Sequence, residues 1–173
     1  MKLEPKDNTT TIHMIFGPQG AGKSTYARNL EMTEKATRFS IDEWMADLFG
    51  SDLPQPLDFG WIMERVKRCE QRIWSTAKDV AQNGNNIVLD LGFMKVKNRS
   101  EFARLANEAG LATRIHFVTA LHELRRQRVM ARNLERGATF SFSVTPAMFN
   151  FMEKQFEPPT ALELSIATVF QSP

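Results

Sequence analysis

The sequence predicts a three-layer α/β protein in which five strands form a mostly parallel sheet, with helices on both faces and an arginine-bearing helical lid. Three observations favour this fold class. Short apolar runs alternate with amphipathic segments along the chain, and such alternation is typical of a parallel sheet covered by helices. A glycine-rich turn joins the first apolar run to the first helical segment. The length of 173 residues suits a single domain, 1–173, with a proper core.

The strands are predicted where apolar residues run continuously or alternate with polar ones. The third run is continuous enough to be buried on both faces, whereas the fourth alternates. The predicted strands are 12–16, 37–41, 86–90, 113–118 and 165–170.

The helices are predicted from apolar residues at helical spacing and from signals at their ends. The longest ends at Asn83-Gly84, and the arginine-rich helix ends at Gly137. Glycine, serine and two prolines make 50–60 a predicted loop. The predicted helices are 25–31, a short one with its apolar face within 44–49, then 61–81, 100–108, 121–135 and 146–156.

Residues 17–24 read Gly-Pro-Gln-Gly-Ala-Gly-Lys-Ser and match the phosphate-binding pattern G-x-x-x-x-G-K-S. The glycines let successive backbone N–H groups point into one anion-sized cavity. Lys23 brings positive charge to the β and γ phosphates, and the Ser24 hydroxyl can ligate Mg²⁺. The dipole of the following helix also favours phosphate. The predicted nucleotide-binding residues of this P-loop are Gly17, Gln19, Gly20, Ala21, Gly22, Lys23, Ser24 and Thr25.

Carboxylates follow two further predicted strands. Asp90 closes an apolar strand and could hold Mg²⁺ beside Ser24, or it could cap the next turn. Asp42 could accept the proton of an acceptor hydroxyl, with Glu43 as the weaker candidate, or it could cap the helix that follows. Gly17, Asp42 and Asp90 all fall at the carboxyl ends of strands, where parallel sheets bind ligands.

Five arginines crowd the predicted helix 121–135 and the residue that follows it. A solvated basic face is the ordinary explanation of such a cluster. However, three of them repeat every four residues and therefore share one face, and lid guanidinium groups neutralise charge during phosphoryl transfer. A lid is therefore predicted at about 125–150. The five are Arg125, Arg126, Arg128, Arg132 and Arg136, and the last three of these share the face.

Composition excludes several classes of protein. A net charge of +2 is too small to indicate a nucleic-acid or membrane partner by itself. The single cysteine, Cys69, excludes an internal disulfide and suits a reducing cytosol. Residues 1–11 lack the apolar core of a signal peptide, and no apolar run is long enough to span a membrane. We therefore expect a cytoplasmic monomer or weak dimer with no membrane partner and a flexible N-terminus over 1–10.

Taken together, these motifs resemble the small bacterial P-loop kinases of the group that contains polynucleotide 5′-kinase, zeta toxins and chloramphenicol phosphotransferase. The resemblance spans about 12–159 and implies binding of ATP and Mg²⁺, with Ser24 and Asp90 as metal ligands. The shared segments are the P-loop, 39–43, 87–93, Arg99, 132–137 and 156–159.

The same resemblance implies roles for individual residues. Asp42 matches the general base of these kinases, and Lys23 the phosphate-binding lysine. Arg132 matches a lid arginine beside the nucleotide and Arg136 one that engages its phosphates. These four are the predicted catalytic residues. Arg99 matches a recurrent arginine that could simply fix the start of a helix.

One position departs from the pattern. Polynucleotide kinases place an arginine three residues after the basic aspartate, to hold the acceptor's phosphate, and here that residue is Met45. Together with Trp44, Phe59 and Trp61 it suggests an apolar acceptor pocket, although core packing explains most such aromatics. A small hydroxylated acceptor is therefore predicted, with a nucleic-acid end less favoured.

The sequence thus predicts a kinase that moves the γ-phosphate of ATP to a hydroxyl of a small molecule. Two alternatives stay open. A 5′-hydroxyl polynucleotide kinase would bind oligonucleotides in a salt-sensitive manner. A nucleotide-dependent regulatory protein would bind ATP without any acceptor. An oligomeric AAA-type motor is not expected, because no separate helical lid domain follows the last predicted strand.

Overall fold

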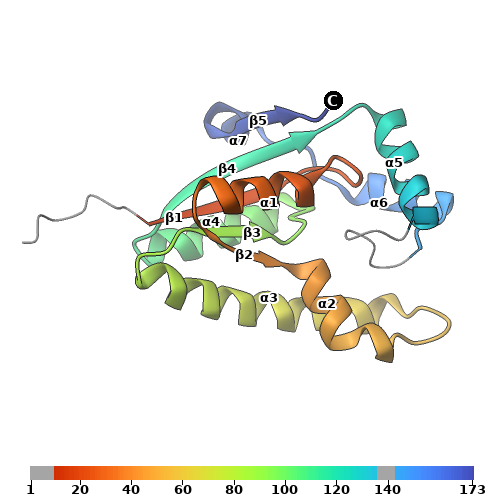
Figure 1. Ribbon diagram of the computed structural model, residues 1–173, viewed down its shortest axis with the longest axis horizontal. Helices are drawn as coiled ribbons and strands as arrows, with labels where there is room; N and C mark the ends of the chain where they lie inside the picture. The colour runs from red at the N-terminus through yellow and green to blue at the C-terminus, as the bar shows by residue number, and fades with distance from the viewer. Residues whose placement is uncertain (1–9, 136–142) are drawn as a thin grey trace, which may run out of the picture.

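Five strands form one sheet in the computed structural model, which describes residues 10–135 and 143–173 (Figure 1). The strand order is β2-β3-β1-β4-β5, and every neighbouring pair is parallel. The carboxyl ends of all five strands therefore meet at one edge of the sheet. This arrangement confirms the predicted fold class, with a sheet that is wholly rather than mostly parallel. The strands are β1 (Thr11–Phe16), β2 (Thr37–Ser40), β3 (Ile87–Asp90), β4 (Ala112–Thr119) and β5 (Thr168–Gln171).

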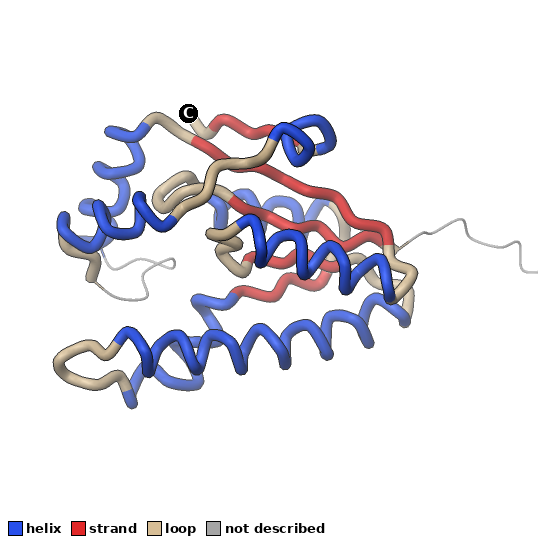
Figure 2. The backbone as a smooth tube through the Cα atoms, turned by 180° about the vertical axis from the view of Figure 1, so that it is seen from behind, coloured by secondary structure: helices blue, strands red, loops and turns tan. Residues whose placement is uncertain are grey.

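Helices cover both faces of this sheet (Figures 1 and 2). On one face α1 packs its buried Ala27 against Ile15 of β1 and Val118 of β4. On the other face α3 and α4 pack against the alternate side chains of β1. The bounds of these helices are α1 (Lys23–Thr33), α3 (Phe59–Gln82) and α4 (Val96–Glu108).

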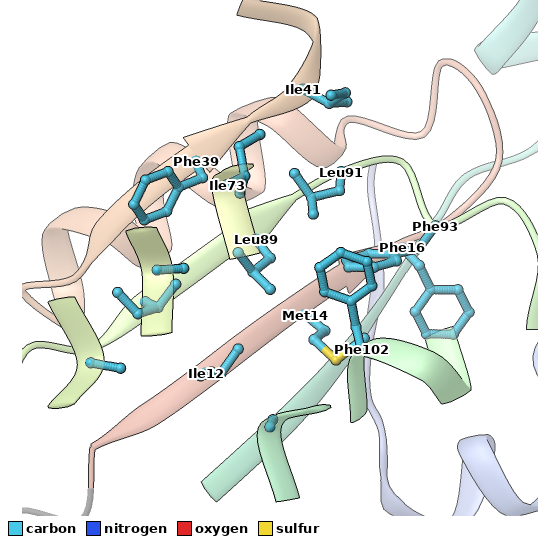
Figure 3. Close-up of a cluster of buried hydrophobic side chains, with 14 of the residues drawn as sticks. Ile12, Met14, Phe16, Phe39, Ile41, Ile73, Leu89, Leu91, Phe93 and Phe102 are labelled. Atoms are coloured by element: carbon cyan, nitrogen blue, oxygen red, sulfur yellow. The ribbon is translucent and has the colours of Figure 1, made fainter. Parts of the chain in front are cut away.

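The larger core cluster lies on the α3 and α4 side of the sheet, as Figure 3 shows. Ile12, Met14 and Phe16 alternate along β1 and enter this cluster, as the two-residue period of a strand requires. Phe93 and Phe102 meet edge to face there, with ring centroids 5.1 Å apart. The cluster anchors the strand that precedes the P-loop.

Of the remaining helices, α2, α5 and α6 lie beyond the carboxyl edge of the sheet, and α7 lies beside β5 (Figure 1). A short arm consists of α2, a 3₁₀ turn and the first half of α3, and α5 and α6 lie opposite it (Figure 1). The bounds are α2 (Ile41–Phe49), η1 (Gly50–Asp52), α5 (His122–Glu135), α6 (Pro146–Gln155) and α7 (Ala161–Ile166).

The prediction of a strand over 165–170 is wrong in its first half. Ser165 and Ile166 end helix α7, and the strand covers Thr168–Gln171 instead. The helix begins at a capping box in which Thr160 and Glu163 each bond the other's backbone N–H, at 3.1 and 2.8 Å. That reciprocal bonding satisfies the first N–H groups of the helix and fixes its start.

Arg99 is only 2% exposed and joins α4 to the chain that leads into α7. Its guanidinium forms an ion pair with Glu163 at 2.5 Å and donates to the carbonyl groups of Phe93, Glu157 and Pro158. The guanidinium also lies over a core aromatic ring. These contacts assign Arg99 to holding the fold rather than to fixing a helix start.

Within residues 10–135 and 143–173, none of the helices combines the length and apolar character needed to cross a lipid bilayer.

Candidate active site

The P-loop connects β1 to α1 at the carboxyl edge of the sheet. Gly20 has a φ of 76°, and a Cβ there would lie 2.5 Å from the carbonyl oxygen of Arg125. Gly22 is the N-cap of α1, with a φ of 92° that side chains other than glycine rarely adopt. The Lys23 ammonium donates to the carbonyl of Pro18 at 3.0 Å, across the loop. The glycines therefore permit both the turn and its close contact with α5.

Three charged groups converge at this loop. Burial lowers the pKa of Lys23, while the nearby carboxylates of Asp90 and Asp42 oppose that shift. Burial likewise raises the pKa of Asp90, and the Lys23 ammonium opposes it. The Lys23 ammonium and the Asp90 carboxylate thus stabilise each other's charged forms where water is excluded, whereas the negative charge of Asp42 adds to the rise in the pKa of Asp90.

Ser24 and Asp90 have the chemistry of a magnesium site. Interaction with the Ser24 hydroxyl lowers the pKa of Asp90, against the larger effect of burial. The Oδ2 atom of Asp90 is buried and has no hydrogen-bond partner among the described residues. The part of the chain that the structure describes contains no group of three His, Cys, Asp or Glu side chains able to hold a metal. One hydroxyl and one carboxylate fit Mg²⁺, which takes few protein ligands and keeps water and phosphate oxygens.

Arg38 was missed by the sequence prediction. It lies on β2, beside Asp90, and its Nη1 atom is 3.7 Å from Asp90 Oδ2, too far for a hydrogen bond. Its other nitrogens bond Glu31 at 3.3 Å and Glu43 at 2.6 Å. The only signal in the sequence was a charged residue inside a strand that ends at the site.

Asp42 lies in the first turn of α2 rather than at the end of a strand, because β2 ends at Ser40. The Ser40 hydroxyl accepts from the backbone N–H of Glu43 and is the N-cap of α2. The alternative that Asp42 caps this helix is therefore wrong. Glu43 is engaged by Arg28 and Arg38, whereas the structure gives Asp42 no ion pair or hydrogen bond with any described residue.

A cavity of about 820 Å³ opens at this edge of the sheet. Asp42, Asp90 and Arg132 all line it, together with most of the predicted P-loop residues. Two of those, Gly17 and Ala21, do not. The P-loop residues that line the cavity are Gln19, Gly20, Gly22, Lys23, Ser24 and Thr25.

The predicted lid is formed in part by α5 and α6, with 136–142 outside the described residues. The side-chain amide of Asn133 makes two hydrogen bonds with the backbone of Val144, at 2.8 and 2.9 Å, and so ties the end of α5 to the start of α6. The neighbouring Arg132 lines the cavity, and its buried Nε has no hydrogen-bond partner among the described residues. Arg136, the second predicted lid arginine, lies outside the described residues. Arg128 lines the cavity but donates to Ser172.

Residues 12–159, most of the chain, match the AAA_33 family, which is described as an AAA domain. The chain belongs to the AAA_33 family. One curated relative, the replication-associated protein of Porcine circovirus 1, is 35% identical over 63 residues. The chain spans 20% of that relative's length.

Solved structures share the fold of this AAA_33 protein at low sequence identity. A Chloroflexus aurantiacus protein provisionally described as a kinase superposes with a TM-score of 0.71 at 17% identity, covering 95% of this chain and 85% of that one. Chaetomium thermophilum Kti12 in complex with ADP-AlF3 gives 0.67 at 17%, covering 93% and 88%. The APS kinase CysC of Mycobacterium tuberculosis, in complex with AMPPNP and APS, gives 0.58 at 16%, covering 87% and 84%. The AAA_33 chain therefore has a P-loop kinase-like fold.

The far wall of the cavity comes from one face of α3, with Phe59, Met63, Val66 and Glu70. Of the aromatic and apolar residues that the sequence suggested for an acceptor pocket, only Phe59 lies there. Trp44 and Met45 pack against the main core cluster instead, and Trp61 lies under the guanidinium of a neighbouring arginine. The sequence did not predict Glu70 as a residue of the site. Its spacing from Phe59, Met63 and Val66 places it on their helix face, but which face of the helix lines the cavity is known only from the structure.

Proposed function

We propose that this AAA_33 protein transfers the γ-phosphate of ATP to a hydroxyl of a small molecule. The observation that carries the proposal is one continuous cavity. Its lining combines the P-loop, Asp90 and Arg132 with Asp42 of α2 and with the α3 wall. A phosphoryl transfer enzyme needs a donor site, a base and an acceptor site within one cavity.

In this mechanism Lys23 and Arg132 hold the β and γ phosphates and stabilise the charge that spreads over the transferring group. Arg136 adds to this charge stabilisation when the lid lies over the phosphates. Ser24 and Asp90 hold Mg²⁺, which when bound neutralises charge on the same phosphates.

Asp42 orients the acceptor hydroxyl and takes its proton. Asp42 lines the cavity and makes no ion pair or hydrogen bond with a described basic side chain, whereas its neighbour Glu43 pairs with two arginines. A free carboxylate next to the bound phosphates supports this role.

An oligonucleotide 5′-end is less well supported as the acceptor. Such an end carries phosphates that require cationic partners. The lining residue Lys95 is already paired with Glu157 at 3.5 Å. The α3 wall itself is apolar except for the acidic Glu70.

The experiment is γ-phosphoryl transfer from labelled ATP with Mg²⁺ into fractions of a metabolite extract and, separately, into 5′-hydroxyl oligonucleotides. An Asp42→Asn variant runs beside the wild type, with Asp47→Asn, an exposed change on the same helix, as the matched control. Label that enters a small molecule with the wild type and Asp47→Asn, but about 10²-fold or more slowly with Asp42→Asn, supports the proposal. Label in oligonucleotides, or ATP binding with no labelled acceptor in either pool, contradicts it.

A further inference from the structure

The α3 wall has a chemical pattern of its own. Phe59, Met63, Val66 and Glu70 are spaced by four, three and four residues, which places them on one helix face. They extend over roughly 16 Å at 1.5 Å per residue. The first three are apolar, and the last is a carboxylate.

Glu70 forms no hydrogen bond or ion pair with any residue in 10–135 or 143–173. Burial raises the pKa of its carboxyl, and within the same ranges no basic neighbour acts against that shift. Taking a carboxylate out of water is costly unless a cation or hydrogen-bond donor accompanies it. The wall therefore favours a ligand that supplies such a group.

Three basic side chains of the cavity lining or of the first half of α3 have partners among the described residues. Lys95 pairs with Glu157, Arg128 donates to Ser172, and Arg65 lies 3.6 Å from the ring centre of Trp61. Arg132 lies close enough to Lys23 of the P-loop for its positive charge to lower the pKa of that lysine. The charged lining residues that α2 and α3 contribute, Asp42 and Glu70, are both acidic, so these two helices present negative charge to the cavity and suit a cationic group of a ligand.

We propose that the acceptor is an amino alcohol with an apolar body. Its hydroxyl lies at Asp42, its apolar part packs against Phe59, Met63 and Val66, and its protonated amine pairs with Glu70. This proposal rests on the phosphotransferase function above and specifies the class of its substrate. No covalent step beyond that phosphoryl transfer is involved.

The test uses a panel of phenyl-substituted and alkyl amino alcohols, each paired with the diol in which a hydroxyl replaces the amine. Binding of each pair is measured by calorimetry on the full chain loaded with Mg²⁺ and a non-hydrolysable ATP analogue. The wild type is expected to bind amines at least about tenfold more tightly than their diols, because charge-assisted pairs are the stronger ones. The Glu70→Gln variant, similar in shape, should reduce that preference to less than about twofold.

Glu64→Gln is the matched control, because Glu64 lies on the same helix, is exposed and pairs with Arg68. It should keep the full preference for amines. If the wild type binds amines and diols equally, binds neither, or keeps its preference after Glu70→Gln, the amine site is overturned. The wild-type comparison of each pair stands even if Glu70→Gln folds poorly.

A second readout separates this inference from the proposed function. The same panel is incubated with labelled ATP and Mg²⁺. Transfer to diols as readily as to amines overturns the amine site and leaves the phosphotransferase proposal standing. A tenfold preference for amines in binding, without transfer to any member, supports the amine site and counts against phosphoryl transfer to this class.

Discussion

Arg125 on α5 binds both carboxylate oxygens of Glu153 on α6, at 2.6 and 2.7 Å, and also donates to the carbonyl of Gln19 in the P-loop, at 3.1 Å. One guanidinium therefore joins the phosphate-binding loop to both α5 and α6. Arg125 is buried, and its planar group suits this two-point contact better than an ammonium would. The arginine-rich helix thus contains a buried structural member as well as cavity-lining ones.

The Arg125→Gln variant is expected to lower the free energy of unfolding by about 2–4 kcal/mol, because it leaves the carboxylate of Glu153 without its buried partner. Nucleotide affinity should fall as well, since the carbonyl of Gln19 loses its donor. Urea denaturation and calorimetric titration with ATP measure the two effects. Arg126→Gln, an exposed change on the same helix, should stay within about 0.5 kcal/mol of the wild type. Equal losses in both variants would mean that the ion pair is not the cause.

The Asp90→Asn variant is expected to weaken Mg²⁺ binding by about 10–100-fold, because a carboxylate ligand or its orienting group is lost. ATP affinity is titrated against Mg²⁺ concentration, with EDTA as the metal-free limit. In the wild type, EDTA should lower ATP affinity markedly, whereas in Asp90→Asn the two conditions should converge. Asp79→Asn, far along α3, should behave as the wild type does. A variant that keeps the full response to Mg²⁺ would remove Asp90 from the metal site.

Two buried histidines should make folding stability depend on pH. Nδ1 of His13 and Nε2 of His116 are 3.0 Å apart, and the hydroxyl of Tyr26 lies 2.9 Å from Nδ1 of His116. Burial lowers the pKa of each histidine from 6.5 to about 4. The unfolded chain therefore binds more protons than the folded one between these values, so stability rises with pH across this window.

This contribution to stability is fully present above about pH 6.5 and is lost as the pH falls towards 4. Between pH 7 and pH 5 the pair should contribute a loss of about 2–4 kcal/mol in the free energy of unfolding. The loss is measured by urea denaturation, as the difference between the wild type and a His13→Gln/His116→Gln double variant, with His116→Gln alone as a milder change. His122→Gln, at an exposed site, should leave the pH dependence intact. Parallel pH curves for the wild type and the double variant would contradict the assignment.

Replacing Arg99 should destabilise the whole molecule rather than the site alone. Arg99→Met leaves Glu163 and three carbonyl groups without their shared donor, and a loss of about 3–5 kcal/mol is expected in urea denaturation. Arg104→Met removes an exposed arginine of the same helix and should cost less than about 1 kcal/mol. A small loss in both would show that the buried network is dispensable for folding.

The sequence allowed the order of strands and helices to be predicted because each strand's apolar run and each helix's periodicity are local properties. It was less informative where an element is short. The pair Thr160 and Glu163 is a readable capping box, yet the apolar residues after it also suit a strand, and the helix was missed. The strand end near Asp42 was placed slightly late for a similar reason, since Ile41 suits both β2 and the first turn of α2.

Contacts between residues far apart in the chain were the second feature that could not be predicted from the sequence. Arg99 and Glu163 are 64 positions apart, and nothing local in either segment indicates that they meet. Trp44 and Met45 were considered for the acceptor pocket because they are large and apolar, but the same property places them against the core. Glu70 lines the cavity through the rotation of α3, which only the packing of that helix on the sheet determines.

The P-loop side and the α3 wall of the cavity differ in how well they tolerate amino-acid substitution. Gly20 lies against the backbone of α5, so substitution there disturbs the packing of that helix on the P-loop. Phe59 and Met63 lie on the outer half of α3 and remain 58% and 47% exposed. Mutations at these two positions can therefore accumulate without loss of the sheet or of the phosphate-binding loop. Divergence among descendants of this protein, or selection in the laboratory, can thus alter what this face of the cavity contacts while the phosphate-binding loop is inherited unchanged.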